Sequence, residues 1–222
     1  MRLLYINPNS TEAMTESIVA SARAALPEAE ILGWTNHAGP PAIQGPEDGD
    51  AAVPGLLALL PAARQAGVEA VIIACFDDTG LDKARAAAHC PVIGIGQAAF
   101  HMAALLGGGF GVVTTLAVSV PVIAANLTSY GFSGVCGAVN ASGLSVLAVE
   151  EGSPATMARL SDEIALTTAS TSGPVVLGCA GMARHRAALE ARTGAVLIDG
   201  VESAALLAAA MIRLRRGSSK TL

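Results

Sequence analysis

The 222-residue chain is strongly apolar and sparsely charged, with 52% hydrophobic residues, 14% charged residues and a formal net charge of −5. This composition excludes a disordered chain and supplies enough apolar side chains for a large core. The negative charge provides no electrostatic footprint for a nucleic-acid partner. Glycines and polar residues interrupt the most apolar stretch, residues 90–113, so we expect no helix that crosses a membrane.

The N-terminal segment MRLLYINPNS starts a strand pattern at once. It lacks the basic, apolar and small-residue regions that form a signal peptide, so we expect a cytoplasmic protein. Eight short apolar runs are predicted strands, and alanine- and leucine-rich stretches of helical length separate them. The predicted strands cover residues 3–6, 30–34, 71–74, 92–95, 111–114, 134–139, 175–178 and 196–199. This alternation predicts an α/β fold, and continuous apolar runs are typical of parallel strands covered on both faces.

An internal repeat with an offset of about 104 residues divides the chain into two similar parts. It pairs VIIAC, which ends at Cys75, with VVLGC, which ends at Cys179, and without insertion it pairs Gly96 with Gly200. The repeat predicts two pseudo-symmetric, flavodoxin-like halves, each with a four-stranded parallel sheet, and an active site in the cleft between them. We place the first half at residues 1–98 and the second at 99–199. The C-terminal helix, at about 200–222, is expected to pack back on the first half.

Cys75 and Cys179 both follow a predicted parallel strand, where ligands bind in open α/β sheets. A helix that begins there would lower the thiol pKa from about 8.5 towards neutrality. Two such thiols on opposite sides of a carbon acid could invert its configuration, because one removes a proton and the other delivers one. A single cysteine of this kind is usually a small buried hydrophobe. The occurrence of a cysteine at equivalent strand ends of both halves favours the catalytic interpretation.

Polar residues follow the first predicted strand of each half and could stabilise the charge of a carbanion. They are Asn7, Asn9, Ser10 and Thr11 in the first half and Thr114 and Thr115 in the second. Helix N-capping is the alternative role of these residue types.

Cofactor and metal chemistry find few suitable residues. The four histidines are scattered and the four cysteines form no CxxC pair, so we expect no metal site. Only two lysines occur, so the chain offers few amines that could form a Schiff base with a pyridoxal cofactor. The segment GIGQAA (94–99) matches a dinucleotide-binding pattern, but no acidic residue follows about twenty positions later. Its glycines are better explained by helix packing, and we expect a cofactor-independent protein.

Seven segments together resemble the hydantoin and allantoin racemase branch of the aspartate/glutamate racemase superfamily. They are INPNST, GPPAIQGPEDGDAAVPGLL, ACFDDTGL, GIGQAA, VVTT, LGCAGM and IDGV, in this order along nearly the whole chain. The resemblance implies a cofactor-independent racemase that uses Cys75 and Cys179 as acid/base pair at C5 of a 5-substituted hydantoin or of allantoin. It also implies a small-molecule substrate and a homo-oligomer. The implied substrate contacts are Asn9, Ser10, Thr114 and Thr115, with pocket walls at Pro40, Ile43, Phe76, Gly181 and Met182.

Three departures from the family pattern affect the substrate rather than the acid/base chemistry. The usual FGDPGL is here FDDTGL, with Asp77 and Thr79. The acidic and aromatic loop that is typical after AIEG is here GPEDGD (45–50), and Asn140 stands where an arginine is expected near the end of the sixth strand. Racemisation of aspartate or glutamate is therefore an alternative, disfavoured by the missing arginine. A non-catalytic flavodoxin-like binding module with buried cysteines is a second alternative. A decarboxylase of the same superfamily would need only one of the two cysteines.

Overall fold

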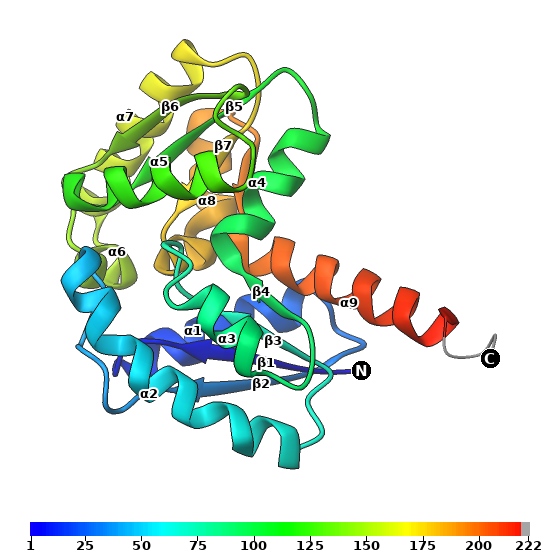
Figure 1. The fold of residues 1–222 in the computed structure, drawn as a ribbon. Coiled ribbons are helices and arrows are strands. Elements are labelled where there is room, and N and C mark those ends of the chain that lie inside the picture. The colour runs from blue at the N-terminus through cyan, green and yellow to red at the C-terminus, as the bar shows by residue number, and fades with distance from the viewer. Residues whose placement is uncertain (219–222) are drawn as a thin grey trace.

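The computed structural model describes residues 1–218 and contains two four-stranded sheets, in which every strand pair is parallel (Figure 1). The first sheet has the order β2-β1-β3-β4 and the second has the equivalent order β6-β5-β7-β8. The predicted α/β fold with two similar halves is confirmed. Each central strand is buried on both faces, which explains its continuous run of apolar residues.

All eight predicted strands are present. Their bounds are β1 Arg2–Asn7, β2 Glu30–Thr35, β3 Ala70–Ile73, β4 Val92–Gly94, β5 Phe110–Thr114, β6 Cys136–Ala141, β7 Val175–Gly178 and β8 Leu197–Asp199. The sixth strand begins two residues later than predicted, because residues 133–135 form a turn in which the N–H groups of Val135 and Cys136 both donate to the Phe132 carbonyl, at 3.0 Å.

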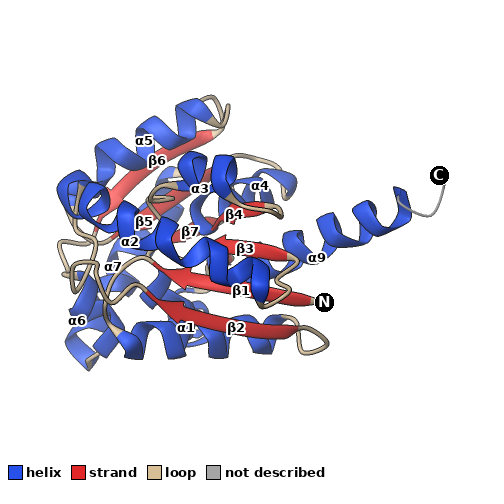
Figure 2. Ribbon diagram, turned by 60° about the horizontal axis from the view of Figure 1, so that its bottom comes forward, coloured by secondary structure: helices blue, strands red, loops and turns tan. Residues whose placement is uncertain are grey.

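Helices cover both faces of the sheets (Figure 2). In the first half they are α1 Glu12–Ala25, α2 Pro46–Gln65, α3 Leu81–Ala87 and α4 Ile95–Leu105. In the second half they are η1 Ala117–Ser119, α5 Val120–Ser129, α6 Val146–Glu151, α7 Pro154–Ser170, η2 Ala180–His185, α8 Arg186–Thr193 and α9 Gly200–Ser218, where η denotes a 3-10 helix. None of the helices within residues 1–218 combines the length and the apolar character needed to cross a bilayer.

The insertion-free register predicted for the repeat is wrong by one residue. Val71 pairs with Val92 in the first sheet, whereas Val175 pairs with Leu197 in the second, one residue further along the chain than the repeat predicts. The second half connects β7 to β8 through η2 and α8 instead of a loop and α3. Cys75 precedes the first residue of β4 by 17 positions, whereas Cys179 precedes the first residue of β8 by 18. Gly200 consequently starts α9 as Ile95 starts α4.

The helix α9 leaves the second sheet and packs on the first half (Figure 1). Its alanines and Val201 share one buried cluster with residues of α1, β1 and β3. The hydroxyl of Tyr5 in β1 also donates a hydrogen bond to the carbonyl of Val201, at 2.8 Å. The sequence predicts this helix to residue 222, and residues 219–222 of that prediction lie outside the described part of the chain.

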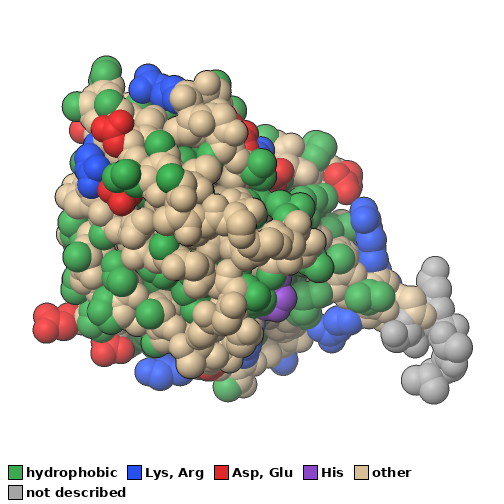
Figure 3. Space-filling model, turned by 90° about the horizontal axis from the view of Figure 1, so that it is seen from above, with side chains coloured by type: hydrophobic (Ala, Val, Ile, Leu, Met, Phe, Trp, Pro, Cys, Tyr) green, Lys and Arg blue, Asp and Glu red, His purple; other side chains and the backbone are tan. Residues whose placement is uncertain are grey.

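The domain boundary between residues 98 and 99 falls inside α4 and stays a prediction. The homo-oligomer also stays a prediction. On the face shown in Figure 3, Lys and Arg side chains lie near the margins and form no continuous basic area.

Candidate active site

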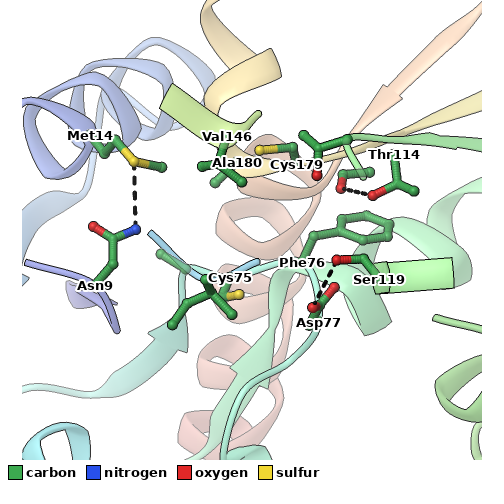
Figure 4. Close-up of a pocket in the computed structure, with 14 residues that line it drawn as sticks. Asn9, Met14, Cys75, Phe76, Asp77, Thr114, Ser119, Val146, Cys179 and Ala180 are labelled. Atoms are coloured by element: carbon green, nitrogen blue, oxygen red, sulfur yellow. Dashed lines mark hydrogen bonds between the residues drawn. The ribbon is translucent and has the colours of Figure 1, made fainter. Parts of the chain in front are cut away.

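Cys75 and Cys179 line the same pocket between the two halves. Cys75 follows β3 after one residue, and Cys179 follows β7 directly. The pocket has a volume of about 380 Å³ including its mouth. Figure 4 shows both thiols directed into it from the two sides. The other residues that line it are Asn9, Met14, Ile43, Ala74, Phe76, Asp77, Thr114, Thr115, Ser119, Val146, Gly178 and Ala180.

The turn after β3 supplies hydrogen bonds to the first thiol. The hydroxyl of Thr79 donates to the Cys75 sulfur at 3.3 Å, and the backbone N–H of Asp77 is a second donor. The N–H of Asp78 donates to the Cys75 carbonyl at 3.0 Å, which closes the turn. Both sulfur contacts favour a thiolate over a thiol.

The 3-10 helix η2 supplies the corresponding donors to the second thiol. Backbone N–H groups of Gly181 and Met182 donate to the Cys179 sulfur. The N–H of Met182 also donates to the Cys179 carbonyl at 3.0 Å. Each half therefore surrounds its cysteine with a turn that offers hydrogen-bond donors to the sulfur.

The expected lowering of the thiol pKa values is wrong for this structure. Burial raises the pKa of Cys179 to about 12, and burial together with the Asp77 carboxylate raises the pKa of Cys75. Neither cysteine begins an α-helix, because a loop follows Cys75 and a 3-10 helix follows Cys179. The hydrogen-bond donors offset only part of the cost of burying a thiolate. Both groups are therefore thiols at neutral pH in this structure.

The structure places seven of the eleven predicted site residues in the lining of this pocket. Asn9, Ile43, Phe76, Thr114 and Thr115 join the two cysteines there. The remaining four, Ser10, Pro40, Gly181 and Met182, lie outside the lining.

Those four residues lie close behind the pocket wall. The N–H of Ser10 donates to the Pro40 carbonyl at 2.9 Å, which joins the loop after β1 to the loop before α2. Gly181 and Met182 contact Cys179 through their backbone, and the Met182 side chain is fully buried in the core of the second half. Asn140, at the position of the expected arginine, donates to the Thr167 hydroxyl at 2.8 Å and lies outside the pocket lining.

Seven lining residues are not among the predicted site residues. Four of them, Ala74, Asp77, Gly178 and Ala180, lie within two positions of a cysteine, and the other three lie far from both cysteines in the sequence. Met14 comes from α1, Ser119 from η1 and Val146 from α6. Met14 and Val146 have the pattern of ordinary core residues, and no local signal distinguishes them. The Ser119 hydroxyl donates to the Asp77 carboxylate at 3.3 Å, so the departure at Asp77 could have directed attention to a polar partner.

Asp78 explains the glycine pattern GIGQAA. Its carboxylate accepts the backbone N–H groups of Gly96 at 2.9 Å and Gln97 at 2.8 Å, at the N-terminus of α4. The hydroxyl of Tyr130 donates to the same carboxylate at 3.0 Å. An added Cβ at Gly94 would lie 2.0 Å from an Asp78 oxygen, so the glycine makes room for it. An aspartate of the chain itself thus occupies the helix end that binds a phosphate in dinucleotide sites.

Two buried aspartates make the stability of the fold depend on pH. Burial raises the pKa of Asp78 to about 7 and that of Asp199 to about 6. The unfolded chain releases these protons near pH 3.9, whereas the folded chain keeps them. The free energy of unfolding should therefore fall with rising pH by about 1.4 kcal/mol per pH unit for each group, from about pH 4 to about pH 6 for Asp199 and to about pH 7 for Asp78. The half-buried Asp77, whose pKa burial also raises to about 6, adds a smaller slope up to about pH 6. Urea denaturation across this range measures the slope.

The Asp78→Asn variant removes one of these titrations and should flatten the slope by the share of one group. The exposed Asp162 of α7 provides the matched control, because Asp162→Asn should leave the slope as it is. A free energy of unfolding that rises from pH 5 to pH 7 would contradict the assignment of these pKa values.

No group of three or more His, Cys, Asp and Glu side chains within residues 1–218 is placed to hold a metal ion. The polar groups that line the pocket are the two thiols, the Asn9 amide, the hydroxyl groups of Thr114, Thr115 and Ser119, and the Asp77 carboxylate. Two similar parallel-sheet halves with one pocket between them, into which a thiol from each half is directed, define an α/β protein with its candidate active site in the cleft between the halves.

The chain belongs to the Asp/Glu/hydantoin racemase family, whose model matches residues 3–208. It is an isomerase of the racemase type. It is 40% identical to a hydantoin racemase of Rhizobium meliloti over 99% of this chain and 92% of the relative, and 31% identical to one of a Pseudomonas strain over 99% and 89%.

Solved structures extend this similarity. An allantoin racemase from Klebsiella pneumoniae superposes with a TM-score of 0.92 at 39% identity, and covers 96% of this chain and 88% of its own. The allantoin racemase from Pseudomonas fluorescens superposes with a TM-score of 0.91 at 34% identity, and the match covers 96% of this chain and 92% of that racemase.

Proposed function

We propose that the protein racemises C5 of a hydantoin ring, in a 5-substituted hydantoin or in allantoin, with Cys75 and Cys179 as the proton-transfer pair. The observation that carries the proposal is the position of the two thiols, at equivalent strand ends of the two halves and in one pocket. The hydantoin and allantoin racemases to which the chain is similar support the choice of ring.

The reaction transfers one proton on each face of the ring. The thiolate of one cysteine removes the C5 proton, and the electron pair of the broken C–H bond moves into the adjacent ring carbonyl as an enolate. The thiol of the other cysteine then donates its proton to C5 from the opposite face. The enantiomer leaves with the same composition, and the thiol and thiolate have exchanged places. The reverse reaction uses the exchanged pair, so one pocket handles both enantiomers.

Polar groups around the thiols are suited to hold the ring. The Asn9 side-chain oxygen is occupied by the Asn7 amide and the Thr11 N–H, at 2.9 and 3.0 Å. The Asn9 amide nitrogen instead faces the Met14 sulfur at 3.5 Å, a weak acceptor that a ring carbonyl can replace. The Thr114 hydroxyl donates to the Gly178 carbonyl at 3.0 Å, which leaves its oxygen free to accept a ring N–H. In this proposal Thr115 completes the polar wall on the same side.

Hydrogen bonds to the enolate would compensate for the cost of forming a thiolate from thiols of such high pKa. A thiolate is costly in the closed pocket, so the enolate must be stabilised by donors that are already in place. Phe76 and Ile43 exclude water from the ring, which strengthens these hydrogen bonds. We propose Ser10, Pro40, Gly181 and Met182 as supports of this wall rather than as direct contacts.

Enantiopure 5-benzylhydantoin, allantoin and aspartate in deuterated water test the proposal. We expect the optical rotation of a hydantoin-type substrate to decay, with deuterium entering at C5 in the proton NMR spectrum, and that of aspartate to stay constant. A reaction without enzyme corrects for spontaneous exchange. Decay for aspartate alone would assign an amino-acid racemase, and constant rotation for all three would overturn the proposed function.

A further inference from the structure

Asp77 is the one charged side chain in the lining of the pocket, as far as residues 1–218 are described. It follows Cys75 by two positions and is half-buried. The amide of Asn126 donates to the Asp77 backbone carbonyl at 2.9 Å, which fixes the residue against α5. The backbone that carries this carboxylate is thus fixed at the wall of the pocket that contains both thiols.

This carboxylate lacks a compensating cation. Within the described part of the chain it accepts one hydrogen bond, from Ser119 at 3.3 Å, and takes part in no ion pair. Burial raises its pKa to about 6, and the Ser119 hydroxyl only partly opposes this change. A half-buried carboxylate that accepts one long hydrogen bond has lost part of its hydration, and a ligand that supplies a positive partner would compensate for this loss.

The carboxylate also acts on the chemistry of its neighbour. After burial, the charge of Asp77 is the largest influence that raises the pKa of the Cys75 thiol. A positive charge bound to Asp77 would cancel this repulsion and make the thiolate of Cys75 easier to form. The binding of a cation would therefore favour catalysis as well as occupancy.

A second cavity adjoins the catalytic pocket at this point. It has a volume of about 490 Å³ including its mouth, and Ile43 and Asp77 line both spaces. Val53 of α2 and Val122 of α5 form apolar walls, which suit an aliphatic chain. The charged residues that line it are all aspartates, namely Asp50, Asp77 and Asp78. No Lys or Arg side chain, among the residues described, lines either space.

We propose that Asp77 selects the substrate, and that the preferred 5-substituent is an aliphatic chain that carries a cationic group, an ammonium or a guanidinium. The inference rests on the proposed function, since it assumes that C5 lies between the two thiols. The substituent then extends from C5 past Ile43 into the adjoining cavity, and its cation contacts the Asp77 carboxylate.

Matched pairs of hydantoins test the proposal at about pH 8, where an alkylammonium and a carboxylate are both charged. The pairs are 5-(4-aminobutyl)hydantoin with 5-pentylhydantoin and 5-(2-aminoethyl)hydantoin with 5-propylhydantoin, equal in chain length within each pair. We expect kcat/KM to be about ten- to a hundredfold higher for the cationic member of at least one pair. Asp77→Asn should reduce this ratio to near one.

The ratio within a pair isolates the substituent, because any effect of Asp77 on Cys75 in the free enzyme acts on both members. Asp77→Gly, which restores the residue of the usual family pattern, is a second variant with the same expected result. The exposed Asp162→Asn is the matched control and should keep the ratio of the unaltered protein.

Three outcomes would overturn the inference while leaving hydantoin racemisation intact. They are equal or better turnover of the apolar members, a ratio that Asp77→Asn does not change, and higher kcat/KM for allantoin or 5-(2-carboxyethyl)hydantoin than for both cationic substrates. Allantoin represents a neutral donor and the carboxyethyl compound an anion. If the unaltered protein racemises no hydantoin at all, the proposed function itself is overturned, and the inference with it.

Discussion

Cys75→Ser and Cys179→Ser are each expected to reduce racemisation by about a hundred- to ten-thousandfold, the usual contribution of a positioned acid or base. A serine hydroxyl in the same place has nearly the same size but ionises far less readily than a thiol. The polarimetric assay in deuterated water measures the loss. Cys136→Ser is the matched control, because Cys136 is half-buried in β6 and lies outside the pocket lining.

Each serine variant retains one thiol, and this thiol should still exchange the C5 proton of one enantiomer with solvent. Deuterium should therefore enter that enantiomer without inversion, and the two variants should act on opposite enantiomers. Proton NMR of each pure enantiomer separates exchange from inversion. Racemisation by either variant at the rate of the unaltered protein would refute the two-thiol mechanism.

Gly94→Ala is expected to lower the free energy of unfolding by about 3 kcal/mol, as overpacking and broken hydrogen bonds at a buried charge do together. The added methyl group would lie 2.0 Å from a carboxylate oxygen of Asp78 and displace it from the N-terminus of α4. The same displacement would move the turn that carries Cys75, so racemisation should fall as well. Urea denaturation and the polarimetric assay measure the two effects.

Gly134→Ala is the control for this substitution, because a Cβ at Gly134 would meet no atom within 4 Å. Its effect should stay within about 0.5 kcal/mol. The double variant Gly94→Ala/Asp78→Ala should be hardly less stable than Asp78→Ala alone, since the clash has lost its partner. Additive losses in this double-mutant cycle would show that Gly94 acts through something other than Asp78.

Sequence reasoning was most successful where the pattern is local. The eight apolar runs predicted the eight strands, and VIIAC and VVLGC predicted that Cys75 and Cys179 follow equivalent strands. It failed for the thiol pKa values, because the depth of burial depends on how the halves close over the pocket. Met14 and Val146 escaped prediction for a related reason, since helices far apart in the chain bring them to the thiols.

The repeat was predicted in outline but not in register. A comparison of VIIAC with VVLGC contains no information about the connection that follows each cysteine. The one-residue shift lies between Cys179 and β8, where η2 and α8 stand in place of the loop and α3 of the first half. The role of Asp78 was hidden as well, because Gly94 and Gly96 lie sixteen or more positions away and contact it through the fold.

The position of α9 has a consequence for the folding of the protein during its synthesis on the ribosome. The core of the first half contains Val201, Ala204, Ala208 and Ile212, all contributed by the last helix of the chain. When β1 to β4 have left the ribosome and α9 has not yet been synthesised, the side of that sheet which α9 covers is still exposed to water. Synthesis of the second half must finish before this surface is covered. The first half is thus begun first, and its core is completed only after residues 201–212 have been synthesised.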